Sequence, residues 1–112
     1  CMEMVPGSDL TLNITLDDIP ILSEAREMYE RGVSTGVNQT NRSLVEKYWK
    51  FPEGSAPILQ ELMLDPQTSG GLLVAVPEDE TIPILKDLHK VGVFPSACIG
   101  YVSNFSEAKL IF

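Results

Sequence analysis

The sequence predicts an α/β (α+β) two-layer domain in which a mixed sheet is covered by helices. Residues 9–16 alternate polar and apolar side chains, which is the period of a strand with one buried face. Residues 72–76 form an apolar run of strand length, and the segments between and after them carry apolar residues at helical spacing. Strands therefore alternate with helices, as in a mixed sheet with helical cover. The length of 112 residues fits a single domain spanning residues 1–112.

The first half should contain one strand and three helices. The strand at 9–16 would bury its apolar residues, which are Leu10, Leu12, Ile14 and Leu16. A helix over 24–31 would begin at Ser23 as N-cap and end at Gly32. Residues 33–41 are polar and predict a loop, and a short helix should end near Lys50. The last helix, over 56–64, would be capped by Ser55.

The second half should add three strands and one helix. Residues 72–76 predict a strand buried on both faces. The helix that follows would direct its apolar residues inward and end at Gly92; those residues are Ile82, Leu85 and Leu88. Residues 97–102 and 108–112 would be neighbouring antiparallel strands, and Cys98 should be buried as a small hydrophobic residue.

Charge and composition exclude several functions. The net charge of −8 argues against non-specific nucleic-acid binding, and the longest apolar run, 72–76, is too short to span a membrane. Two cysteines form neither a disulfide framework nor a metal site. The acidic groups, at 17–18 and 78–80, suit a strand end and a helix start, and His89 suits a helix C-terminus. We therefore expect no catalytic residue and no metal ligand in this chain.

The segment from Asp65 to Gly71, Asp-Pro-Gln-Thr-Ser-Gly-Gly, carries the strongest functional signal. Its candidate binding residues are Gln67, Thr68, Ser69, Gly70 and Gly71. Backbone amides beside the glycines could approach an anion closely, and the hydroxyl and amide side chains add donors. The loop precedes a strand, so the helix dipole of a phosphate loop is missing. A tight turn in which Thr68 and Ser69 satisfy buried backbone groups explains the residues equally well.

This seven-residue motif resembles the signature of selenophosphate synthetases (selenide, water dikinases). Those enzymes belong to the aminoimidazole ribonucleotide synthetase-like family. The resemblance continues through Gly7-Ser8, residues 10–16 and 19–22, and then through 72–76 and 99–102, so it covers nearly the whole chain. One region departs from the pattern. Where the family has Pro-Gly-Gly-Thr-x-x-Asn, residues 35–41 keep Gly36 and Asn41 and lose the second glycine and the threonine.

The resemblance implies that the chain is a truncated C-terminal domain, without the N-terminal ATP- and Mg²⁺-binding catalytic domain and without its own first helix. The parent enzyme would make selenophosphate, AMP and phosphate from ATP, selenide and water. It would be a cytoplasmic homodimer with no membrane or nucleic-acid partner. The isolated chain would be inactive and bind no cofactor, while the loop at 65–71 would form part of the ATP cleft.

Two alternatives remain open at this point. The chain could be the same domain of another ATP-dependent synthetase of the superfamily, although those relatives carry other words at the loop. It could also be a free-standing α/β binding module without a catalytic partner. The sequence encoded upstream of Cys1 would distinguish these possibilities.

Overall fold

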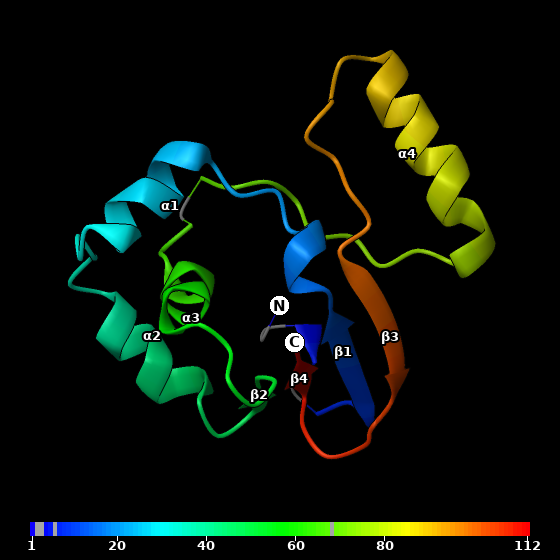
Figure 1. Ribbon diagram of the computed structural model, residues 1–112. Helices are drawn as coiled ribbons and strands as arrows, with labels where there is room; N and C mark the ends of the chain where they lie inside the picture. The colour runs from blue at the N-terminus through cyan, green and yellow to red at the C-terminus, as the bar shows by residue number, and fades with distance from the viewer. Residues whose placement is uncertain (2–3, 6, 68) are drawn as a thin grey trace.

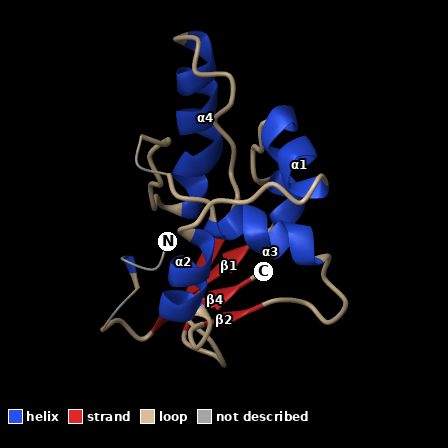
Figure 2. Ribbon diagram, turned by 90° about the vertical axis from the view of Figure 1, so that its left-hand side faces the viewer, coloured by secondary structure: helices blue, strands red, loops and turns tan. Residues whose placement is uncertain are grey.

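The computed structural model describes residues 1, 4–5, 7–67 and 69–112, and in these residues it shows a mixed four-stranded sheet with four helices. The expected α/β class is therefore confirmed. The sheet lies at one end of the molecule, three helices gather beside it, and the fourth stands apart (Figures 1 and 2). Within the described residues, no helix is long and apolar enough to cross a membrane.

The sheet has the order β2-β4-β1-β3. The central strand β1 (Leu10–Ile14) pairs antiparallel with β3 (Gly100–Asn104) and parallel with β4 (Leu110–Ile111). The edge strand β2 (Trp49–Lys50) pairs parallel with β4. The expectation that the last two strands are neighbours is wrong, because β1 lies between them and hydrogen-bonds to both. Sequence proximity suggested a hairpin, but β1 offers two long-range partner edges that the local pattern does not reveal.

The alternation in residues 9–16 is confirmed where it matters most, since Leu12 and Ile14 are buried and form a core with Val5 and Leu110. Leu10 at the strand end is exposed. Thr11, on the opposite face, is fully buried at 0% exposure. Its hydroxyl donates to the Ala108 carbonyl at 2.7 Å and accepts from the Ser106 amide at 3.3 Å. Burial of a polar residue is tolerated because its hydrogen bonds are satisfied.

Helices α1 (Ser23–Glu30), α2 (Asn38–Val45) and α3 (Pro57–Leu64) form one group, in which α1 and α2 both pack on α3. We call this group the helical lobe (Figure 1). The loop expected at 33–41 is too long, because α2 already begins at Asn38. The helix expected to end near Lys50 ends at Val45, and β2 follows it.

The predicted serine caps are also wrong. Leu22 and Ala56 occupy the N-cap positions of α1 and α3, with no side-chain cap hydrogen bond. Ser23 donates instead to the Glu24 carboxylate, and Ser55 donates to the Pro52 carbonyl. The helix stops are correct, since Gly32 has a φ of 76° just after α1, a conformation that favours glycine.

Residues 71–99, which we call the α4 arm, differ most from expectation. The predicted strand at 72–76 has no strand structure, and Leu72 is 95% exposed. The arm contains the 3-10 turn η3 (Glu78–Glu80) and helix α4 (Thr81–Lys90), which ends before Gly92. Ile82 is exposed rather than inward, and Cys98 is exposed rather than buried. An apolar run becomes a buried strand only when a neighbouring edge pairs with it.

Candidate functional site

The loop that the sequence singled out connects α3 to the α4 arm. Its described residues are 65–67 and 69–71, and Thr68 lies outside the described residues. Gln67, Ser69, Gly70 and Gly71 are exposed, whereas Asp65 is half-buried against the helical lobe. The loop therefore has an anchored base and an exposed tip.

Asp65 fixes the base of the loop through both of its carboxylate oxygens. The Tyr29 hydroxyl of α1 donates to one oxygen at 2.6 Å. The side-chain amide of Gln67 donates to the other oxygen, also at 2.6 Å. Gln67 was expected to offer this amide to a ligand, but the structure uses it within the loop.

Gln67 also packs over the first glycine of the loop. A Cβ built on Gly70 would lie 3.2 Å from both the Cβ and the Oε1 of Gln67. A Cβ on Gly71 would meet no atom within 4 Å. Gly70 is therefore constrained by its own loop, while Gly71 leaves open space in which a partner group could approach the backbone.

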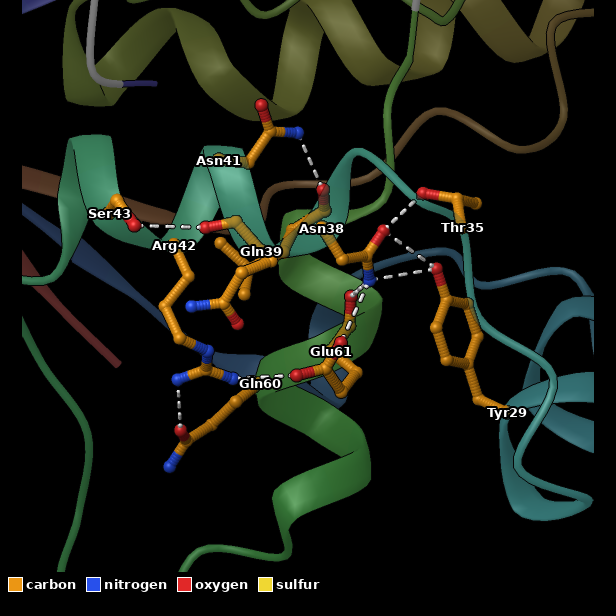
Figure 3. A network of polar contacts seen from close by, with 10 residues as sticks. Tyr29, Thr35, Asn38, Gln39, Asn41, Arg42, Ser43, Gln60 and Glu61 are labelled. Atoms are coloured by element: carbon orange, nitrogen blue, oxygen red, sulfur yellow. Dashed lines mark hydrogen bonds and ion pairs between the residues drawn. The ribbon is translucent and has the colours of Figure 1, made fainter.

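Behind the loop, Asn38 joins all three helices of the lobe (Figure 3). Its side chain is buried at 3% exposure. Its amide nitrogen shares two protons among three acceptors: the Glu61 carbonyl at 3.0 Å, the Glu61 carboxylate at 3.0 Å and the Tyr29 hydroxyl oxygen at 3.1 Å. Its carbonyl oxygen accepts from the Thr35 hydroxyl at 2.5 Å. With its hydrogen bonds satisfied, this buried amide fixes the relative positions of the helices.

Two further side chains of α2 complete the polar contact with α3. Asn41 donates to the Leu64 carbonyl at 2.7 Å, directly before Asp65. Arg42 donates to the Glu61 carboxylate at 2.8 Å and to the Gln60 side chain at 3.2 Å. Asn41 is one of the residues that the divergent segment at 35–41 retains. The Asp65–Gly71 loop and the divergent segment at 35–41 thus meet at the C-terminal end of α3.

Burial and hydrogen bonding within this network shift two pKa values. Burial, followed by the hydrogen bond to Asp65, raises the pKa of Tyr29 above its ordinary value, so the hydroxyl stays a donor near neutral pH. The Arg42 hydrogen bond, followed by that of Asn38, lowers the pKa of Glu61. The network therefore stabilises a protonated Tyr29 and an ionised Glu61.

Among the described residues, the other polar groups form no comparable site. Asp17 and Asp18 lie in a 3-10 turn after β1, and residues 78–80 form the turn before α4. His89 bonds to the Ser96 carbonyl at 3.1 Å, near the end of α4. Across the described parts of the chain, no three His, Cys, Asp or Glu side chains lie close enough to hold a metal ion.

A broad apolar recess of about 1750 Å³ lies between the α4 arm and the sheet. The residues lining it include Leu72 and Val74 from the arm, Leu85 and Leu88 from α4, and Val102 from β3. The loop borders this recess through Asp65, Gln67 and Gly71. The recess thus extends from the base of the loop to its last glycine.

Comparison with known proteins tests the resemblance that the loop carries. No family model matches the sequence. The chain is 33% identical over 97% of its length to selenide, water dikinase 2 of Peptoclostridium acidaminophilum. It is 36% identical over 90% of its length to the selenide, water dikinase of Myxococcus xanthus, and 34% identical over 97% to that of Porphyromonas gingivalis. The chain is homologous to a domain-sized region of the selenide, water dikinases.

The resemblance carried by the Asp65–Gly71 loop is therefore confirmed at the level of family. The chain spans 28% to 31% of the length of these curated relatives. Homology to the dikinases thus covers nearly all of this chain but less than a third of each relative. Sequence reasoning identified the loop but missed its anchor, Tyr29, Asn38 and Asn41. The spacing of Asn38, Asn41 and Arg42 at i, i+3 and i+4 was the available signal, since it places three polar side chains on one helical face.

Proposed function

We propose that this chain is the C-terminal domain of a selenophosphate synthetase, which makes selenophosphate, AMP and phosphate from ATP, selenide and water. The observation that carries the proposal is the identity of 33% over 97% of the chain to a selenide, water dikinase. The matched share of 31% of that relative leaves room for a separate N-terminal catalytic domain. In this proposal the parent enzyme is a cytoplasmic homodimer, and the first helix of this domain precedes Cys1.

Within this function, the loop at 65–71 would form one wall of the ATP cleft. Support comes from its exposed tip, formed by Ser69, Gly70 and Gly71, and from the open space beside the Gly71 backbone. The hydroxyls of Thr68 and Ser69 would add donors to phosphate oxygens. The loop leads into a segment without regular secondary structure rather than into a helix, so these donors would act without a helix dipole.

Mg²⁺ would accompany ATP in such an enzyme, because phosphoryl transfer relies on metal ions to neutralise the phosphate oxygens. The described residues do not fit this role, since no three acidic, His or Cys side chains among them converge on one point. We therefore assign Mg²⁺ binding to the other domain.

The proposal is tested by comparing the isolated chain with the full-length protein encoded around it. The full-length protein should form AMP and selenophosphate from ATP, selenide and Mg²⁺, measured by ³¹P NMR. The isolated chain should form neither. AMP formation by the isolated chain would contradict the assignment of catalysis to the other domain. An encoded sequence without a Gly- and Asp-rich domain upstream of Cys1 would favour a free-standing binding module.

The loop has its own test in the full-length enzyme. Substituting Thr68→Ala and Ser69→Ala together should raise the KM for ATP by about tenfold, the size expected for losing hydrogen bonds to charged groups. A matched control substitutes Thr40→Ala and Ser43→Ala, two exposed hydroxyl residues on α2. Unchanged ATP affinity and turnover in the loop variant would leave the loop a structural turn.

A further inference from the structure

We infer that Tyr29 and Asp65 are positioning residues that hold Gln67, and through it the glycine turn, in the conformation that receives ATP. This inference rests on the proposed function, which assigns the loop at 65–71 to the ATP cleft. It adds residues from α1 and α2 to a site that the sequence placed in the loop alone.

The first step is a chain of two short hydrogen bonds. Tyr29 lies 36 residues before Asp65 and reaches it from another helix, with 2.6 Å between the hydroxyl and the carboxylate oxygen. The second carboxylate oxygen lies 2.6 Å from the Gln67 amide nitrogen. Hydrogen bonds to a charged acceptor are about twice as strong as neutral ones. Because both oxygens are engaged, the carboxylate has one preferred orientation.

The second step explains why Tyr29 itself is fixed. The buried Asn38 amide donates to the Tyr29 hydroxyl oxygen at 3.1 Å. This occupies an acceptor position of the hydroxyl. The hydroxyl also lies 3.4 Å from the Asn38 carbonyl oxygen, but its single proton goes to the nearer and charged Asp65 oxygen at 2.6 Å. Asn38 is in turn held on the Glu61 backbone carbonyl at 3.0 Å. The orientation of Asp65 is therefore set by the packing of the helical lobe.

The third step connects Asp65 to the glycines. The Gln67 side chain that Asp65 holds lies over Gly70, where an added Cβ would come within 3.2 Å of it. Gln67 thus covers one side of the turn and leaves the other side, at Gly71, open. Without the Tyr29 hydroxyl, Asp65 and Gln67 lose their fixed orientation, and the turn samples conformations that do not match the phosphates.

The experiment uses Tyr29→Phe in the full-length protein, with Tyr101→Phe as control. Tyr101 is an exposed tyrosine on β3, outside the helical lobe, so Tyr101→Phe is a matched deletion of a hydroxyl. Hydrogen exchange of the amides at 65–71, followed by mass spectrometry, should become about tenfold faster in Tyr29→Phe and stay unchanged in the control. The KM for ATP should rise by about tenfold, with a smaller change in kcat.

A second variant keeps the test decisive if Tyr29→Phe loosens the lobe. Gln67 is exposed, so Gln67→Ala removes the last side chain of the Tyr29–Asp65–Gln67 hydrogen-bond series without disturbing helix packing. It should accelerate amide hydrogen exchange at 69–71 only. Unchanged hydrogen exchange of the amides at 65–71 in both variants would overturn the inference. It would also be overturned if the amides of β1 exchanged faster by the same factor as those of the loop. If the wild-type protein showed no dikinase activity, the proposed function would fail, while the exchange measurements would still decide whether Tyr29 positions the loop.

Discussion

The helical lobe and the α4 arm are built from opposite kinds of contact. In the lobe, α2 meets α3 through the polar side chains of Asn38, Asn41 and Arg42, each bonded to a partner on α3. In the arm, Leu72 and Val74 are exposed. Among the described elements, the preceding turn η3 is the only one with which α4 makes more than a few contacts. The lobe is closed by specific hydrogen bonds, whereas the arm presents apolar surface.

The difference shows where order in this chain originates. A satisfied polar network permits few alternative packings, so the lobe fixes its own geometry. An arm with few buried apolar contacts has a low local stability, and its conformation depends on the few points where it joins the sheet. The loop at 65–71 lies at the boundary, with its base in the lobe and its far end in the arm. Its geometry should therefore follow the lobe.

The largest effect is expected at Gly100, where the arm joins the sheet. A Cβ at this position would lie 1.9 Å from the Asn13 carbonyl oxygen. Gly100→Ala should therefore separate β3 from β1 and lower the free energy of unfolding by about 4 kcal/mol, as measured by urea denaturation. Gly36→Ala is the control, because an added Cβ there meets no atom within 4 Å. Similar losses in both variants would contradict the close approach of the two strands.

The contrast between the regions can be measured directly with a pair of leucines. Leu64, in α3, is 3% exposed, whereas Leu88, in α4, is only half-buried. Leu64→Ala should cost about 3 kcal/mol of unfolding free energy, and Leu88→Ala about 1 kcal/mol. Thermal and urea unfolding of the two variants provide the measurement. A cost at Leu88 as large as that at Leu64 would show that the arm is packed as firmly as the lobe.

The sequence allows β1 and the ends of α1 and α4 to be predicted, because alternation and glycine stops are local signals. It does not reveal α2, because the buried side of that helix is polar at Asn38 and Asn41, and apolar periodicity cannot detect it. Thr11 was assigned to a polar face for the same reason, although its hydroxyl is buried and paired. Burial of polar side chains depends on partners that are distant in sequence.

Strand pairing limits the prediction in the same way. Residues 72–76 have strong strand propensity, yet they form no strand, because propensity does not supply a neighbouring edge. For the candidate site, the loop could be found because glycines and polar side chains form a continuous word. Tyr29 could not be found in this way, because its partner Asp65 is 36 residues away and its position in the helix resembles that of an ordinary apolar residue.

The lobe should also respond to acid more than the arm does. Because the pKa of Glu61 is lower in the folded chain than its ordinary value of 4.5, the folded state binds fewer protons there than the unfolded state. Stability from this group is therefore present above pH 4.5 and is lost as the pH falls through the lowered value. Urea unfolding at pH 7 and pH 3.5 measures this effect. The unfolding free energy of Glu61→Gln should be about 1 kcal/mol below that of wild type at pH 7, and this difference should become smaller at pH 3.5. A constant gap would contradict the linkage.

The smallest effect is expected for an ion pair of the arm. Lys90 and Asp87 approach to 2.7 Å on α4, but their side chains are 73% and 74% exposed. Water and salt screen such a pair, so Lys90→Ala should change the unfolding free energy by less than about 0.5 kcal/mol. Arg42→Ala is the matched comparison, because Arg42 bonds to Glu61 at 2.8 Å, is 26% exposed and lies 5.5 Å from the centre of the Trp49 ring. It should cost about 2 kcal/mol, since a half-buried carboxylate loses its partner. Equal costs for the two variants would contradict the prediction, because they would mean that the half-buried ion pair of the lobe stabilises the fold no more than the exposed pair of the arm.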